Sequence, residues 1–268
     1  RKARGLQNIL RLGIAQVLFL NTAPHAAVNE SVDMTAELGF TAHRKMVNAV
    51  LRRLSREGQK LILDQDAPRL NTPAWLWETW AAAYGEDVCR QIAEAHASEP
   101  SLDISVAQDP ETWAKRLEAE TLPTGSLRRP SGGRVTELPG FEEGTWWVQD
   151  AAAALPVTLL GDVKGKTVID LCAAPGGKSA QLAALGANVI AVDRSENRNK
   201  RLRANLARLN LEVETVTADA ETWQPKELVD AVLLDAPCSS TGTLRRHPDV
   251  GWLKSTEDVT KLANLQSR

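Results

Sequence analysis

The chain shows three successive patterns of apolar and polar residues. In residues 1–63, apolar positions recur every three or four residues, as in "LQNILRLGIAQVLFL" and "HRKMVNAVLRRL". This spacing is typical of amphipathic helices. A loop at "NTAPHAA" precedes a second helix, which we expect to begin near Pro24 because proline is favoured in the first turn. Residues 1–63 are therefore predicted to form a small helical domain.

Residues 64–145 combine the two-residue alternation typical of strands with the three-to-four-residue spacing typical of helices. "SLDISVAQ" alternates like a strand, "PETWAKRLEAE" has helical spacing, and "GGRVTELPGF" and "GTWWVQD" predict short strands between turns. Thr72 is expected to cap a helix with Pro73 at its first position. The tryptophans of "AWLWETW" fit a helix core better than an exposed stacking surface. We expect a small α/β unit here.

Residues 146–268 alternate between buried strands and helices. Four strands are predicted within "KTVIDLC", "ANVIAVD", "VETVTADA" and "VDAVLLD", and Gly186 is expected to end the helix between the first two. Such alternation indicates a mostly parallel sheet with helices on both faces. Ligands of these sheets bind outside the carboxyl ends of the strands.

Composition narrows the class of protein only a little. The 268 residues are 43% hydrophobic with a net charge of -2, and no apolar run approaches the ~20 residues that span a bilayer. Three cysteines and four histidines are scattered, so we expect no disulfide framework, no metal site and no membrane segment. A reducing cytoplasm fits best. Two basic regions, residues 1–70 and 194–208, are either solvated helix faces or contacts for a polyanion.

The loop "DLCAAPGGKS" after the first predicted strand matches neither common phosphate-binding motif. A Walker A motif would need glycine where Cys172 stands, and the dinucleotide motif G-x-G-x-x-G is absent. Pro175 also occupies a position that a pyrophosphate loop keeps bare. A nucleotide-dependent dehydrogenase or kinase is therefore disfavoured.

The polar residues at the strand ends suit a ligand without phosphates. Gly176 and Gly177 permit close backbone approach, Asp193 can accept two ribose hydroxyls, Asp219 can meet an adenine amino group, and Lys178 can pair with a carboxylate. Each acid alone could simply cap the next helix. Together they favour an adenosine with an amino-acid tail, S-adenosylmethionine.

The segments "DLCAAPGGK", "AVDRS" and "LLDAPCSSTGTLRRHPDVGWL" resemble the RNA cytosine-C5 methyltransferases of the NOL1/NOP2/Sun family. The likeness covers nearly the whole chain and is strongest to members that modify 16S ribosomal RNA. "HAAVNESV" with "VNAVLRRL" resembles the NusB-like RNA-binding domain of such enzymes. The resemblance implies three parts: a NusB-like domain at 1–63, a linker unit at 64–145 and a Rossmann-like methyltransferase domain at 146–268.

The resemblance also implies residue roles. The cofactor S-adenosylmethionine would be bound by Cys172, Ala173, Ala174, Pro175, Gly176, Gly177, Lys178, Asp193, Asp219 and Asp235. Asp235 would also contact the target base, and Arg245 and Arg246 would meet RNA phosphate or hold their loop in shape. Ribosomal RNA is the expected partner, and a monomer is the expected state.

Cys238 has two candidate roles. Its place after the fourth strand suggests the nucleophile that adds to cytosine C6. In the family, a later Thr-Cys supplies that thiol and the Pro-Cys cysteine helps product release. No Thr-Cys occurs in this sequence. We therefore expect a C-terminally truncated chain with an incomplete sheet, weak or no cofactor binding and no methyl transfer. The alternative is a noncatalytic RNA-binding adaptor with the same fold.

Overall fold

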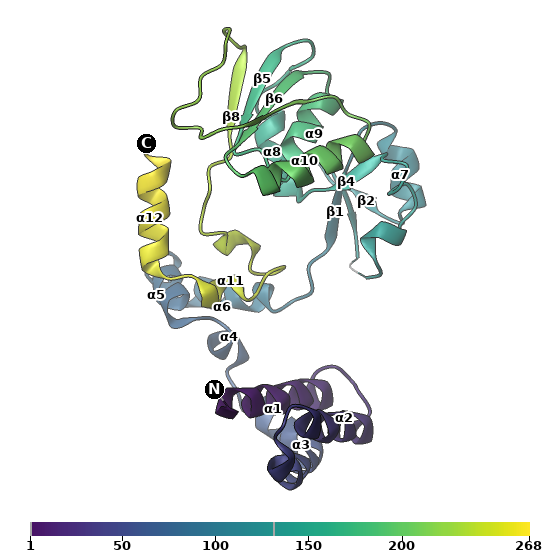
Figure 1. The fold of residues 1–268 in the computed structure, drawn as a ribbon, viewed down its shortest axis with the longest axis vertical. Coiled ribbons are helices and arrows are strands. Elements are labelled where there is room, and N and C mark those ends of the chain that lie inside the picture. Colours follow the sequence, from purple (N-terminus) through teal and green to yellow (C-terminus); the bar gives the residue numbers. More distant parts are fainter. Residues whose placement is uncertain (1, 131) are drawn as a thin grey trace. The chain divides into compact units, whose positions relative to one another are not determined.

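The computed structural model describes residues 2–130 and 132–268, and it divides into two compact units (Figure 1). The first unit runs from Arg1 to Asn71 and the second from Thr72 to Arg268. The predicted boundaries near residues 63 and 145 stay predictions. No helix in the described ranges is long and apolar enough to cross a membrane.

The first unit is helical, as predicted. Its elements are α1 (Lys2–Leu18), α2 (Pro24–Glu37), a 3-10 turn (Thr41–His43), α3 (Arg44–Leu63) and α4 (Ala67–Leu70). Pro24 occupies the first position of α2, as expected from the sequence. Ile9, Val28, Val47 and Leu51, one or two from each long helix, form its buried core. The apolar stripes read from the sequence are therefore the surfaces on which the three helices pack.

The second unit begins with two helices, which are followed by an antiparallel sheet and a third helix. The helices are α5 (Ala74–Tyr84), α6 (Glu86–His96) and α7 (Pro110–Arg116). The sheet has the order β2-β3-β1-β4, with β1 (Leu102–Val106), β2 (Glu120–Thr121), β3 (Leu127–Arg129) and β4 (Trp146–Val148). Ile104, Trp113, Leu127 and Trp146 fill its core. The strand expected in "SLDISVAQ" is confirmed as β1.

Two local predictions in this region are wrong. "GGRVTELPGF" contains a 3-10 turn, Val135–Glu137, where a strand was expected, because Gly132, Gly133 and Gly140 take positive φ angles and break extended pairing. Pro73 has extended backbone (φ -54°, ψ 143°), so it stands at the N-cap and α5 begins one residue later, at Ala74. Thr72 is therefore not the cap.

The second sheet is parallel, with the order β7-β6-β5-β8. Its strands are β5 (Thr167–Leu171), β6 (Asn188–Asp193), β7 (Glu214–Thr217) and β8 (Ala231–Leu234). The helices beside it are α8 (Ala151–Thr158), α9 (Gly177–Ala184) and α10 (Glu196–Arg208). The chain moves outward from β5 to β7 and returns to β8 on the other side of β5. This reversal makes the carboxyl ends of β5 and β8 the expected ligand crevice.

The chain after β8 crosses back to the start of the unit. It forms a 3-10 turn (Thr241–Thr243), α11 (Val250–Leu253) and α12 (Thr256–Gln266). Trp75 Nε1 donates to the Gly251 carbonyl at 3.0 Å, which ties α5 to α11. Figure 1 shows α11 beside α5 and α6. Residues 176 positions apart thus frame the loop that carries Cys238.

Candidate functional site

The carboxyl edge of the parallel sheet brings three of the strand-end acids together. The charges of Asp193 and Asp235 both act on Asp170, the last acid of β5, and so does the charge of Lys178. Lys178 Nζ pairs with Asp235 Oδ2 at 2.8 Å, joining the first turn of α9 to the end of β8. The predicted cluster around the glycine loop is therefore assembled by the fold.

Asp170 is the most buried of these acids, with 0% of its surface exposed. Burial raises its pKa to about 6, although Ser179 Oγ donates to its Oδ2 at 2.6 Å. Its Oδ1 has no hydrogen-bond partner among the described residues. A buried carboxyl with one unused oxygen stands beside the loop. No separate role for Asp170 was predicted from the sequence, although an acid within an apolar strand was visible there.

Asp193 holds the glycine loop in shape. Its Oδ2 accepts from the Ala174 N–H at 3.2 Å and pairs with Arg198 Nη1 at 3.1 Å, and its Oδ1 accepts from the Ser195 N–H at 2.9 Å. Arg198 also donates to the Ala174 carbonyl. Each carboxylate oxygen has two acceptor sites, so Oδ1 keeps one for a further donor.

The loop itself needs glycine at one position for conformational reasons. Gly176 has φ +104°, and a Cβ there would lie 3.1 Å from Leu202 Cγ. At Gly177 a Cβ would meet nothing closer than Gln149 at 3.9 Å. Gly176 is thus explained by the turn and its packing, whereas at Gly177 an added Cβ would make only ordinary van der Waals contact with Gln149.

The two remaining acids are exposed. Asp219 follows β7, and its Oδ1 accepts from the Glu221 N–H at 3.1 Å, a local turn that leaves the carboxylate facing solvent. Asp235 has 58% of its side chain exposed despite its ion pair with Lys178. Both acids are available to a ligand at this edge.

The three cysteines lie in different environments. Cys89 is buried, Cys172 is half-buried and Cys238 is exposed. Burial, and secondarily the charge of Asp193, raises the pKa of the Cys172 thiol, which opposes formation of a reactive thiolate. Cys238 Sγ lies 3.4 Å from the Ser240 backbone N–H, a donor that stabilises electron density on sulfur.

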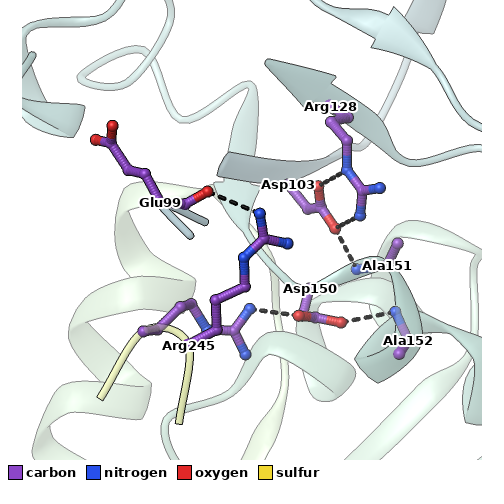
Figure 2. A network of polar contacts seen from close by, with 8 residues as sticks. Glu99, Asp103, Arg128, Asp150, Ala151, Ala152 and Arg245 are labelled. Carbon is purple, nitrogen blue, oxygen red and sulfur yellow. Dashed lines mark hydrogen bonds and ion pairs between the residues drawn. The ribbon is translucent and has the colours of Figure 1, made fainter. Parts of the chain in front are cut away.

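Arg245 and Arg246 bind protein groups. Arg245 donates to the carbonyls of Ser98 at 3.3 Å and Glu99 at 2.8 Å, and Arg246 pairs with Asp150 (Figure 2). Both arginines thereby fix the loop after Cys238 against the region between α6 and β1 and against the start of α8. This agrees with the expectation that they hold their loop in shape, and contact with RNA stays a prediction.

One buried residue that the sequence did not single out links the two sheets. Gln149 Oε1 accepts from Ser105 Oγ and Trp147 Nε1, both at 2.8 Å, and its Nε2 donates to Gln181 Oε1 at 2.9 Å. Ser105 lies on β1 and Gln181 on α9, so this side chain joins the antiparallel sheet to the glycine-loop helix. A polar residue directly after the apolar run "WWV" was its sequence signal.

Comparison with known proteins decides the family. Residues 157–268 match the model of "16S rRNA methyltransferase RsmB/F", and residues 1–56 match the NusB family. Ribosomal RNA small subunit methyltransferase B of Vibrio cholerae is 37% identical over 99% of the chain, and that of Cronobacter sakazakii is 36% identical over 99%. Residues 157–268 belong to the RsmB/F methyltransferase family.

The chain spans 65% and 66% of the length of those two relatives. A solved structure called PH0851 superposes with a TM-score of 0.80 at 25% identity, covering 97% of this chain and 64% of that one. A methyltransferase homologue from Pyrococcus horikoshii gives a TM-score of 0.56 at 27% identity, over 68% of this chain and 62% of its own. The NusB-like helical domain and the methyltransferase domain predicted for this chain are thus confirmed.

Proposed function

We propose that this chain carries the cofactor and base-recognition edge of an S-adenosylmethionine-dependent enzyme that methylates C5 of a cytosine in 16S ribosomal RNA. The observation that carries the proposal is the cluster of Asp170, Lys178, Asp193 and Asp235 at the carboxyl ends of β5, β6 and β8. Family membership supports the reaction class. The relatives named above are ribosomal RNA small subunit methyltransferases.

The residues present fit this cofactor. An adenosine with an amino-acid tail needs acceptors for hydroxyl and amino donors, a cation for its carboxylate and no phosphate cradle. Asp193 Oδ1 and the exposed Asp219 are the acceptors, and Lys178 is the cation. Gly177 carries no side chain, so a ligand can approach the backbone at the start of α9. When bound, the sulfonium cofactor supplies an electrophilic methyl group.

The chain's own residues prepare the two ends of the site. Lys178 is 15% exposed and shares its charge between Asp235 and any carboxylate that enters, so the Lys178–Asp235 pair couples the cofactor end to the base end. Asp235 can accept a hydrogen bond from a cytosine amino group and offset charge that develops at N3. A base must leave its stack to reach this edge, which favours single-stranded or loop RNA.

Cys238 is assigned to product release. Cytosine C5 becomes nucleophilic when a thiolate adds at C6, and the adduct collapses when the C5 proton leaves and the thiol is expelled. An exposed cysteine three residues after Asp235 is placed to assist that second stage. The proposal names no attacking thiol among these residues, because the family places it in a Thr-Cys pair and none occurs here.

A second candidate is a noncatalytic RNA-binding adaptor that keeps the methyltransferase fold. The NusB match at residues 1–56 supports RNA contact in either case. Only methyl transfer distinguishes the two functions.

A chimera tests the proposed reaction. Residues 1–268 are joined to the remaining part of the Vibrio cholerae relative, of which they cover 65%, and expressed in bacteria without their own ribosomal RNA small subunit methyltransferase B. We expect 5-methylcytosine in 16S RNA with the chimera and none with residues 1–268 alone. Methylation by residues 1–268 alone would overturn the nucleophile assignment. A folded chimera that methylates nothing, or another base, would overturn the function.

A further inference from the structure

A second polar site lies outside the predicted cofactor residues. A cavity of about 110 Å³ is lined by three arginines, Arg128, Arg245 and Arg246, and by two aspartates, Asp103 and Asp150. These side chains come from β3, from the loop after β8, from β1 and from the residue before α8. Figure 2 shows Arg128, Arg245, Asp103 and Asp150 converging from these separate elements.

Both aspartates are already neutralised within the protein. Asp103, with 5% of its side chain exposed, accepts from Arg128 Nε at 2.7 Å, from Arg128 Nη2 at 2.8 Å and from the Ala151 N–H at 3.0 Å. Asp150 accepts from the Ala152 N–H at 2.8 Å and from Arg246 Nη1. Three guanidinium charges against two carboxylates leave the cavity with one net positive charge.

The arginines keep unused donors. Arg128 uses only Nε and Nη2, Arg245 only Nε and Nη2, and Arg246 only Nη1 for side-chain hydrogen bonds within residues 2–130 and 132–268. Arg128 Nη1, Arg245 Nη1, and Arg246 Nε and Nη2 are therefore free to donate to a ligand. A planar guanidinium with two free nitrogens suits a tetrahedral oxyanion.

We propose that this cavity binds one backbone phosphodiester of the RNA. A phosphodiester carries one negative charge, which matches the net charge of the cavity, and it offers two free oxygens to the unused donors. Arg245 and Arg246 lie seven and eight residues after Cys238 on the same loop, so the bound phosphate would set the register of the strand. The inference rests on the proposed function, which supplies RNA as the substrate, and it adds the contact that positions it.

The alternative is that these ion pairs only fasten the loop to the rest of the unit. The Asp150→Asn variant distinguishes a phosphate site from ion pairs with a purely structural role. Asparagine still accepts the Ala152 N–H and caps α8, but it removes one negative charge and releases Arg246. A phosphate site then gains positive charge and binds RNA more tightly. If the ion pairs are purely structural, the variant only loosens the loop, and RNA affinity falls or stays the same.

The experiment measures binding of a fluorescein-labelled, single-stranded RNA of about 12 nucleotides to the 268-residue chain. We expect R246Q to weaken binding about fivefold and to reduce the slope of log affinity against log salt by about 0.7, the value for one phosphate contact to a single strand. We expect D150N to tighten binding about threefold. Thermal unfolding of each variant shows that it is folded, and tighter binding by D150N cannot come from misfolding.

The exposed pair Arg134–Glu137 supplies matched controls. Its atoms lie 3.3 Å apart, and R134Q and E137Q make the same charge changes in the same unit. Shifts in R246Q and D150N no larger than in these controls would overturn the phosphate site and leave RNA binding intact. Absence of RNA binding by the wild-type chain would overturn both the site and the RNA substrate. If R246Q abolishes thermal stabilisation by inorganic phosphate without changing RNA affinity, the site takes free phosphate and the RNA assignment is wrong.

Discussion

Single buried charges set the pH response of this protein. Asp170 sits at the end of a buried strand and its pKa is raised to about 6 by burial. Asp103 behaves in the opposite way: burial alone would raise its pKa, but hydrogen bonds from Arg128 and the Ala151 N–H outweigh it and the pKa is lowered. The two acids therefore give stability contributions of opposite sign.

The Asp170→Asn variant tests the contribution of Asp170 to the pH dependence of stability. The folded chain binds a proton at Asp170 between pH 3.8 and about 6, where the unfolded chain has lost it. The free energy of unfolding should therefore fall as pH rises through this window. Relative to D170N, the wild type should lose about 3 kcal/mol between pH 4 and 7. Urea unfolding at several pH values measures the difference, and parallel curves would contradict it.

The Asp103→Asn variant tests the contribution of Asp103 to stability. Its carboxylate is charged in the native state above its lowered pKa, so its stabilisation is present near pH 7 and is lost as pH falls below about 4. We expect D103N to lower the free energy of unfolding by about 2–3 kcal/mol at pH 7, because Arg128 and the Ala151 N–H lose a shared partner. The exposed Arg134–Glu137 pair gives the control: E137Q should lower the free energy of unfolding by under about 0.5 kcal/mol. Equal losses in the two variants would refute the account.

At the scale of elements, the sequence predicted what local periodicity encodes. The strands and helices from β5 to β8 follow one another as the alternation indicates, and the helices of residues 1–63 follow their apolar stripes. The short strands β2 and β3, with two and three residues, carry no readable period. The pairs Asp103–Arg128 and Asp150–Arg246 join residues 25 and 96 positions apart, which no local pattern shows.

Gly144 makes another contact between distant elements that no local sequence pattern shows. It has φ +67°, and a Cβ there would lie 1.8 Å from the Arg208 carbonyl oxygen at the end of α10. We expect G144A to lower the free energy of unfolding by about 3–5 kcal/mol, from the left-handed backbone and the clash together. Gly125 has φ +85° with nothing within 4 Å, so G125A should cost only about 1–2 kcal/mol. Chemical denaturation measures both, and equal losses would show that α10 gives way.

At the scale of the whole molecule, a helical NusB-like unit precedes a methyltransferase domain, whose parallel sheet gathers acids around a glycine loop at its carboxyl edge. The strand β8 exposes Val232 and Leu234, at 51% and 57%. The central claim concerns that carboxyl edge: it is a site for S-adenosylmethionine, whereas phosphate-bearing nucleotides lack a cradle there.

The most direct test is a thermal-shift comparison of S-adenosylhomocysteine, NAD and ATP on the chimera of residues 1–268 and the remaining part of the Vibrio cholerae relative, with D219N and D162N as a matched pair of variants. Asp162 makes the same local turn as Asp219, to the Lys164 N–H at 3.0 Å, but it precedes β5, at the amino edge. We predict that, of the three ligands, only S-adenosylhomocysteine raises the Tm. D219N should weaken the affinity for S-adenosylhomocysteine at least about tenfold, and D162N should leave that affinity unchanged. A rise with NAD or ATP and none with S-adenosylhomocysteine would contradict the account.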